Sequence, residues 1–313
     1  MYIHVILETL PLSRACAKYF TLADAVNLLR FGTTMQIRPW GTRGSLPSPG
    51  PSTVRYGGNT SCVEVRLRDG SLIILDAGSG IRSLGAMMGA CHATLLLTHY
   101  HYDHIQGLPF FGPGYVPTSA IRVYGPESEG QLPLQVLAQQ MVRPFFPAPF
   151  SELRGVCAYT LLPVEPFPIG SATIRSARVS HPGPTFGYRI EDEDSVFVYI
   201  SDNEVDLATP DTLRDILDLC SGADLLLHDC QYTEAEYTPR RGWGHSTPRQ
   251  AVRVAREAGV RTLMTFHHDP SHSDEEVEAL GEEARLLARG DFDVIIGTEG
   301  ETVEIGQPAR KAS

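Results

Sequence analysis

The segment Ala93–His104, "ATLLLTHYHYDH", carries the strongest local signal in this chain of 313 residues. After the apolar run and one threonine come three histidines and one aspartate within six residues. The apolar run predicts a buried strand, and the residues just beyond it lie where the backbone has left the sheet. Neutral imidazole and carboxylate are ligands that suit zinc, manganese and iron. The segment therefore predicts a metal site at the carboxyl end of a strand.

Single donor residues follow three other apolar runs of the chain. His181 follows "ATIRSARVS", Asp202 follows "VFVYIS" and His267 follows "TLMTF". Because residues at the ends of neighbouring strands can meet at one edge of a sheet, we expect these side chains to complete the site. Taken singly, each also fits a simpler role as a loop residue, an Asx turn or a solvated histidine.

The composition limits the classes of function. A formal net charge of −11 argues against extended nucleic-acid binding, which depends on clustered Lys and Arg. The six cysteines form no CxxC pair, so neither a disulfide framework nor a thiolate zinc site is indicated. No run approaches the roughly 18 to 20 apolar residues of a membrane span, and no signal-peptide pattern is present. We expect a cytoplasmic protein that does not associate with membranes.

The rest of the chain has the pattern of a layered α/β fold. Short apolar runs come first, and strands and amphipathic segments then alternate, which predicts two sheets packed face to face with helices outside. Two helices are expected, one capped by Thr247 and ended by Gly259, the other capped by Ser273 and ended by Gly290. Strands are expected at 62–67, 71–76, 93–99, 121–125, 172–180, 185–190, 195–202, 223–229, 261–266, 292–297 and 302–306.

The ends of the chain stand apart from this pattern. The organised pattern begins at Met35, so residues 1–34 are expected to be an extension, with a helix from Leu22 to Phe31 packed on the domain as the alternative. One domain is expected over residues 35–306, followed by a tail at 307–313. The Pro and Gly content of Gly44–Gly58 predicts a long loop.

Several motifs together resemble a known family. "THYHYDH", "SH" before "FGYRIE", "YISD" and "GHSTPRQAVRVAREAGVRTLMTFHHDP" are similar to the metallo-β-lactamase fold hydrolases, and among them to the ribonuclease Z and phosphodiesterase branch. "GGNTSC" and "LIILDAGSG" match the same pattern. The resemblance covers roughly Met35–Gly306. It implies an αββα sandwich of two mixed β-sheets flanked by helices, with a dinuclear metal site at one edge.

The resemblance also implies a set of metal ligands. One metal would be held by His99, His101 and His181, the second by Asp103, His104 and His267, and both by a bridging Asp202. Two divalent ions at such a site share a water, lower its pKa and hold both the attacking and the leaving oxygen. A metal-bridging hydroxide would then be the nucleophile, and Asp103 would orient it. Zinc is expected, and manganese and iron stay open because all three accept these ligands.

The choice of the last histidine ligand rests on spacing. The two neighbouring histidines of "FHHDP" are both candidates. The distance to Pro270 favours His267 over His268.

The stretch "WGHST", Trp243–Thr247, is a second candidate for chemistry. By the resemblance, His245 would stabilise charge or protonate the leaving oxygen, and Asp229 in "LLLHDC" would orient it. The alternative places His245 in a loop that only caps a helix. His228 ends an apolar run and is expected to be a semi-buried histidine with its hydrogen bonds satisfied.

The segment between His104 and His181 departs from ribonuclease Z. It has no arm rich in Gly and Lys of the kind that grips transfer RNA, which, with the negative charge, argues against tRNA processing. The aromatic-rich part, Tyr115–Phe150 with Phe110 and Phe111 before it, is expected to form a wall or lid over the site or an oligomer interface such as a homodimer. Packing in the core is the alternative.

These observations favour a metal-dependent phosphodiesterase acting on a small molecule, such as a cyclic nucleotide. The pair formed by His245 and Asp229 favours phosphoryl chemistry, because acyl cleavage does not need a second cationic group. Hydrolysis of a lactone, thioester or amide is the alternative, since the fold alone does not decide the bond. A non-catalytic metal-binding protein and a tRNA 3′-processing ribonuclease are less favoured.

Overall fold

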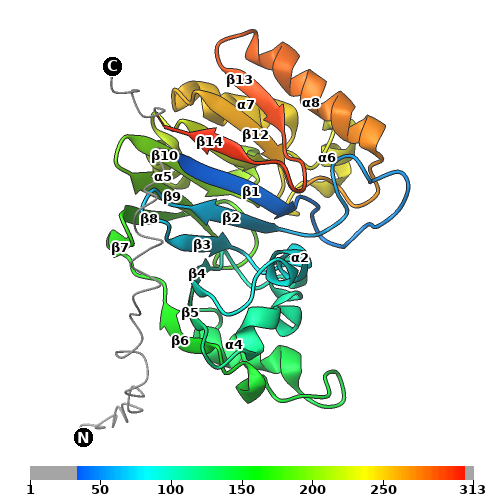
Figure 1. Cartoon of the computed structure of the whole chain (residues 1–313). Helices are drawn as coiled ribbons and strands as arrows, with labels where there is room; N and C mark the ends of the chain where they lie inside the picture. The colour runs from blue at the N-terminus through cyan, green and yellow to red at the C-terminus, as the bar shows by residue number, and fades with distance from the viewer. Residues whose placement is uncertain (1–33, 307–313) are drawn as a thin grey trace, which may run out of the picture.

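The computed structural model describes residues 34–306. The expectations for residues 1–33 and for the tail at 307–313 lie outside this range. Two seven-stranded sheets form the centre of the molecule and pack face to face (Figure 1). Helices cover the outer faces of both sheets, so the predicted αββα sandwich of two mixed sheets is confirmed.

The first sheet comes from the N-terminal half and has the order β14-β1-β2-β3-β4-β5-β6. Its strands β14, β1, β2 and β3 pair antiparallel, and β3 to β6 pair parallel. The strand bounds are β1 Met35–Gly41, β2 Cys62–Arg66, β3 Leu72–Leu75, β4 His92–Leu96, β5 Ala120–Gly125, β6 Val156–Leu161 and β14 Val303–Ile305.

The second sheet has the order β13-β12-β11-β10-β9-β8-β7 and repeats this arrangement. Strands β7 to β10 pair antiparallel, and β10 to β13 pair parallel. The bounds are β7 Phe167–Ile169, β8 Ala172–Arg178, β9 Phe186–Asp192, β10 Ser195–Ile200, β11 Leu225–Asp229, β12 Thr262–Phe266 and β13 Asp293–Ile296. The carboxyl ends of β3 and β4 in one sheet, and of β8, β10, β11 and β12 in the other, lead into the candidate site.

The helices lie outside the sheets (Figure 1). Helices α2 and α4 contact strands of the first sheet, while α5, α7 and α8 contact the second. The α-helix bounds are α2 Gly80–Ala86, α3 Tyr102–Ile105, α4 Pro133–Ala138, α5 Pro210–Cys220, α6 Glu234–Arg240, α7 Pro248–Glu257 and α8 Asp274–Ala288. Short 3-10 helices are η1 Leu108–Phe110, η2 Gly112–Tyr115, η3 Gln139–Met141, η4 Phe150–Glu152 and η5 Val205–Leu207. No helix in residues 34–306 has both the length and the apolar character needed to span a membrane.

The space between the sheets is filled by apolar side chains of both. Leu96 of β4 and Val63 of β2 belong to the same buried cluster as Tyr199 of β10 and Leu227 of β11. Burial of this apolar area holds the two sheets together. Two tyrosine hydroxyls also cross between the sheets, because Tyr188 donates to the Leu97 carbonyl at 2.5 Å and Tyr199 donates to the Asp76 carboxylate at 2.9 Å.

The two predicted helices are present, and one of their caps differs from the prediction. Ser273 caps α8 by accepting a hydrogen bond from the Glu276 amide, as expected. Thr247 stands at the N-cap position of α7 but makes no side-chain cap bond. Its hydroxyl instead donates to the Glu234 carboxylate at 2.6 Å, which is a stronger, charge-assisted bond.

The aromatic segment divides between core and surface. Phe111 and Phe150 belong to the buried cluster under α2 and α4, as the core alternative predicts. Phe110 and Phe145 are 58% and 83% exposed. The segment is therefore neither wholly core nor wholly surface, and its exposed part leaves an apolar face on the protein.

Candidate metal centre

The turn after β4 carries four donor side chains. The Thr98 amide and hydroxyl both donate to the Asp76 carboxylate, which turns the chain out of the sheet. His101 then takes extended backbone angles as the N-cap of α3, and Asp103 and His104 lie in the single turn of that helix. His99 and His101 therefore lie before the helix and Asp103 and His104 within it, with all four at the end of β4.

A first donor group is formed by His99, His101 and His181, whose donor atoms lie within 4.8 Å of one another. His181 comes from the loop after β8, and its Nε2 lies 3.1 Å from Nδ1 of His101. His99 is 3% exposed, while His101 faces solvent. This group is therefore the one that a substrate can approach from outside.

A second donor group contains Asp103, His104, Asp202 and His267, all buried. His104 Nε2 lies 3.2 Å from Asp103 Oδ2 and 3.1 Å from Asp202 Oδ1. His267 Nε2 lies 3.1 Å from Asp103 Oδ2 and 3.4 Å from Asp202 Oδ2. Ligands at 2.0–2.1 Å from a tetrahedral zinc are about 3.3–3.4 Å apart, so the spacing of these atoms fits one ion.

Asp202 stands between the two groups. While Oδ1 faces His104, Oδ2 lies 3.9 Å from Nε2 of His99 and 3.8 Å from Nε2 of His181. The side chain enters from the loop after β10, with 2% of it exposed. This is the place that a bridging carboxylate would occupy.

Three buried atoms of the two groups have no hydrogen-bond partner. They are Nε2 of His99, Nε2 of His104 and Oδ1 of Asp202. A buried polar atom without a partner is unfavourable unless another group binds it. Because all three are potential metal ligands that face the centre of the cluster, the residues present fit a divalent metal site.

The charge of the cluster leads to the same conclusion. Burial alone would lower the pKa of His104, but the carboxylates of Asp202, Asp103 and Asp76 raise it well above its usual value. Burial likewise opposes ionisation of Asp103 and Asp202, yet His104 holds the pKa of both well below the usual range. The carboxylates of Asp103 and Asp202 therefore place negative charge at the centre of the cluster, which divalent cations would offset.

Four of the five histidines in the two donor groups have an acceptor at the other ring nitrogen. Thr98 Oγ1 lies 2.9 Å from Nδ1 of His99, and Asp76 Oδ2 lies 2.8 Å from Nδ1 of His104. Nδ1 of His181 donates to the Gly244 carbonyl at 2.9 Å, and Nδ1 of His267 to Gln231 Oε1 at 2.9 Å. Such bonds select the tautomer that leaves Nε2 free to bind a metal. Burial also lowers the pKa of His181 to about 4, which keeps this ring neutral.

Asp76 is the main residue of the site that sequence reasoning missed. It is fully buried at the end of β3, and it accepts hydrogen bonds from Thr98, His104 and Tyr199. The motif "LIILDAGSG" contained it, but gave it no role. An aspartate at the end of an apolar run was the available signal, as it was for Asp229 in "LLLHDC".

His267 and His268 lie in different surroundings. His267 belongs to the second donor group. His268 Nε2 instead donates to the Gly297 carbonyl at 3.0 Å, and burial lowers the pKa of this ring to about 3. His268 is therefore part of the core, while His267 points to the candidate centre.

The loop predicted over Gly44–Gly58 also reaches the centre. The Ser45 amide donates to Oδ2 of Asp103 at 2.7 Å. Gly44 lies against the ring of His267, where a Cβ atom would come within 2.4 Å of ring atoms. The start of this loop therefore packs over the second donor group, and only glycine fits at position 44.

His245 and Asp229 form a buried pair beside both donor groups. Nδ1 of His245 lies 2.8 Å from Oδ2 of Asp229, and burial lowers the pKa of His245. The His245 ring stacks on His267 at 4.9 Å and meets the edge of His181 at 5.2 Å. His228 bonds the Asp229 carbonyl and Asn203. It is satisfied as expected but fully rather than partly buried, because β11 lies inside its sheet.

Comparison with known proteins gives the family. The model of the beta-lactamase superfamily domain matches residues 73–268, which include every candidate ligand. A ribonuclease Z from Haloferax volcanii is 28% identical over 286 residues, covering 76% of this chain and 87% of the relative.

Solved structures show the same fold. The metallo-beta-lactamase fold protein YhfI from Bacillus subtilis has a TM-score of 0.64 at 20% identity, covering 87% of this chain and all of that one. A diphosphatase from the PhnP family has a TM-score of 0.64 at 18% identity, covering 87% of this chain and 97% of its own. The chain therefore belongs to the beta-lactamase superfamily, as a metallo-β-lactamase fold hydrolase that is similar to ribonuclease Z.

Proposed function

We propose that this hydrolase is a phosphodiesterase that cleaves a small phosphodiester, such as a cyclic nucleotide. The observation that supports this most is the His245 and Asp229 pair beside the two donor groups. Cleavage of a phosphodiester expels an alkoxide or phenoxide, which needs a proton from a nearby donor. An imidazole held by a carboxylate supplies such a proton.

The two donor groups would hold two divalent metal ions, for which we propose zinc. When bound, the ions would lower the pKa of a water and neutralise charge on the phosphate. His99, His101 and His181 would hold one ion, and Asp103, His104 and His267 the other, with Asp202 shared. Manganese or iron would suit the same ligands.

The chain itself orients two groups for the reaction. Oδ2 of Asp103 accepts a hydrogen bond from the Ser45 amide, which fixes the orientation of this carboxylate within the second donor group. Asp229 engages Nδ1 of His245, so Nε2 is the atom that exchanges a proton with the leaving oxygen. The carboxylate also stabilises the imidazolium form while His245 carries the proton.

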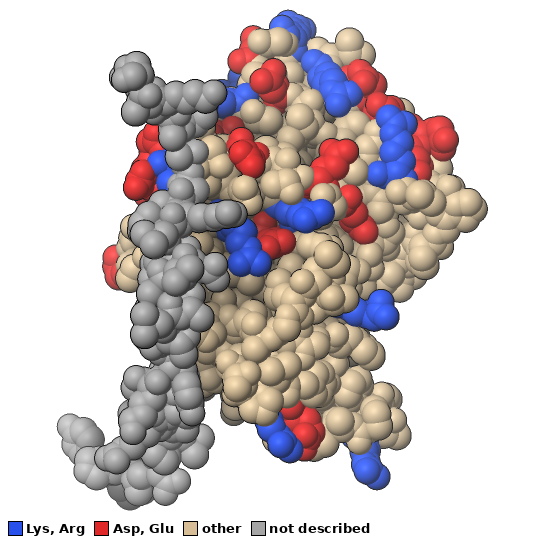
Figure 2. Space-filling view, in the orientation of Figure 1, with Lys and Arg blue, Asp and Glu red and all other residues tan. Residues whose placement is uncertain are grey.

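The charge on one face and the pocket beside His181 support a small substrate. On the face in Figure 2, Lys and Arg are interspersed with Asp and Glu, and the lower part over β5, β6 and α4 is mostly uncharged. That face offers no continuous basic track for a phosphate backbone. An open pocket of about 440 Å³ adjoins His181 and Gly244, a volume within the usual range for small-molecule sites.

The proposal extends to partners and location. The exposed Phe110 and Phe145 would suit a homodimer interface on the apolar face described above. The cysteine pattern suits the cytoplasm. Size-exclusion chromatography with light scattering would test the dimer, and a monomer at all concentrations would exclude it.

The first experiment is hydrolysis of bis(p-nitrophenyl) phosphate by protein reconstituted with zinc or with manganese. We expect metal-dependent cleavage, and we expect His245→Ala to lower kcat with metal content unchanged. The loss should approach about 10²- to 10⁴-fold for a basic leaving oxygen and be smaller for p-nitrophenoxide. His92→Ala, which removes an exposed histidine at the start of β4, is the matched control and should leave the rate unchanged.

A parallel assay with p-nitrophenyl acetate distinguishes the alternative. If the protein does not cleave the diester but cleaves the acetate in a metal-dependent way, hydrolysis of a lactone, thioester or amide would replace the proposal. His245 would then be a structural loop residue.

A further inference from the structure

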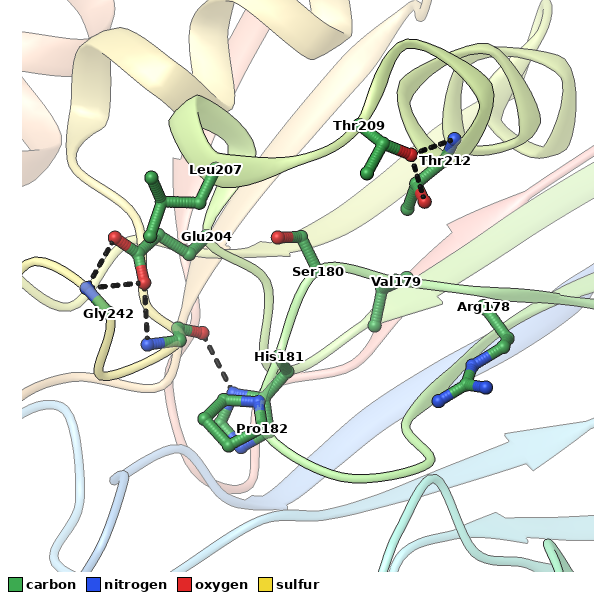
Figure 3. Close-up of a pocket in the computed structure, with 11 residues that line it drawn as sticks. Arg178, Val179, Ser180, His181, Pro182, Glu204, Leu207, Thr209, Thr212 and Gly242 are labelled. Carbon is green, nitrogen blue, oxygen red and sulfur yellow. Dashed lines mark hydrogen bonds between the residues drawn. The ribbon is translucent and has the colours of Figure 1, made fainter.

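The pocket beside the metal centre contains a buried carboxylate, Glu204, that the proposed reaction does not use. Glu204 lies two residues after Asp202 and is 2% exposed. Its carboxylate accepts hydrogen bonds from the Gly242 amide at 2.8 and 3.0 Å and from the Gly244 amide at 2.8 Å, as Figure 3 shows. The Tyr237 hydroxyl adds a further bond at 2.9 Å.

Glu204 forms no salt bridge within the described part of the chain. Among residues 34–306, no Lys, Arg or His side chain lies within ion-pair distance of Glu204. Its carboxylate is instead bonded by two backbone amides and one hydroxyl. A buried carboxylate is tolerated when such donors surround it, and hydrogen bonds to a charged acceptor are about twice as strong as neutral ones. The bonds from Gly242 and Gly244 should therefore be among the strongest that this loop makes.

The loop that Glu204 holds leads directly to His245. This segment, Gly242–Gly244, connects the end of α6 to His245, and both glycines have positive φ angles of 92° and 93°. At Gly244 a Cβ atom would come within 2.2 Å of the His181 ring. Any other residue would be strained there, so the segment is shaped to pass close to His181.

The segment is bonded on both of its faces. The Gly244 amide bonds Glu204, and the Gly244 carbonyl accepts from Nδ1 of His181 at 2.9 Å. The Glu204 amide in turn donates to the Ser180 carbonyl at 2.6 Å. Glu204 thus ties together the loop after β8, the loop after β10 and the loop that carries His245.

We propose that Glu204 is a positioning residue, which holds Gly242–Gly244 against the His181 loop and so places His245 beside the two donor groups. Glu204 does not touch the reacting atoms itself. Its kinetic consequence rests on the proposed function, whereas its effect on the loop does not. The two parts therefore need separate measurements.

The first measurement is amide hydrogen exchange over residues 238–247 of the metal-loaded protein. Glu204→Gln keeps the shape but turns an amide group towards the Gly242 and Gly244 donors. We expect exchange of these two amides to rise roughly 10-fold or more, with metal content unchanged. Glu301→Gln, an exposed glutamate, is the control and should exchange like the wild type. Should E204Q be insoluble, Glu204→Asp tests the same bonds, because it keeps the charge and shortens the reach.

The second measurement compares two leaving groups, with bis(p-nitrophenyl) phosphate and diphenyl phosphate as substrates. The more basic phenoxide depends more on His245. We therefore expect Glu204→Gln to lower kcat roughly 10- to 100-fold, and more for diphenyl phosphate, as His245→Ala does. The variant that combines Glu204→Gln with His245→Ala should have the kcat of His245→Ala within about twofold, because both substitutions act on the same group, His245.

Three outcomes would overturn the proposal. They are unchanged exchange at Gly242 and Gly244, multiplicative losses in the double variant, and loss of metal from E204Q, which would show that the carboxylate acts on His181 instead. A wild type inactive on both diesters would overturn the proposed function, and the exchange result would still decide whether Glu204 holds the loop.

Discussion

The two sheets contribute to the metal centre in different ways. The first sheet supplies His99, His101, Asp103 and His104 from one turn after β4. The second sheet supplies its donors one at a time, from the loops after β8, β10 and β12. Both sheets have the same pattern of antiparallel and parallel pairing, so strand topology does not cause the difference.

The difference shows which half of the site is local. In the turn after β4, a few consecutive residues and the first turn of α3 set the relative positions of the donors. In the second sheet, the positions depend on the register of strands far apart in sequence and on the packed core between the sheets. The three predictions below test this contrast, in order of expected effect.

The largest effect is expected at Asp103, the carboxylate of the local half. Asp103→Ala should abolish turnover and weaken binding of the second metal, because Oδ2 lies 3.1 Å from His267 Nε2 and also receives the Ser45 amide. Steady-state kinetics and metal analysis measure both effects. Asp215→Ala, on the exposed side of α5, is the control. Undiminished activity of the Asp103 variant would remove this residue from the mechanism.

A smaller effect is expected at His267 and His268, the two adjacent histidines of the distant half. His267→Ala should lose about one equivalent of metal, since its Nε2 faces Asp103 and Asp202. His268→Ala should keep both equivalents and lose about 1–3 kcal/mol of stability, because a buried ring and its bond to Gly297 are removed. Metal analysis and urea unfolding distinguish the two. Metal loss from His268→Ala instead would reverse the assignment.

The smallest effect is expected from the acceptors behind the ligands. Asp76 holds His104 in the local half, and Gln231 holds His267 in the distant half. Removing such a partner typically lowers metal affinity or activity by about 10- to 100-fold. Asp76→Asn should lie near the upper value, because the carboxylate is charged and also binds Thr98 and Tyr199. Gln231→Ala should lie near the lower value. Competition with a metal-binding dye measures both, and a larger loss for Gln231→Ala would contradict the contrast.

Much of the fold was predictable, because the spacing of apolar residues along one sequence already indicates strands and helices. The expected strands correspond to β2 to β5 and to β8 to β14, and the two expected helices to α7 and α8. The edge strands β6 and β7 were missed, because partly exposed edge strands lack a clear apolar pattern. Strand β1, which lies inside the first sheet, was not among the expected strands either. Helices α2 to α6 were missed as well, although Thr209 and Pro210 mark the start of α5.

The order of residues along the chain was enough to indicate the family and the residue types of the metal centre, since an apolar run followed by "HYHYDH" is typical of a metal-binding turn at the end of a strand. Which distant side chains join that turn depends on the folded chain. Folding places His267 at the centre and His268 in the core, puts Asp76 behind His104, and brings Glu204 to the loop before His245. No local pattern encodes these contacts, because they form across strands and loops that are neighbours only after the two sheets pack.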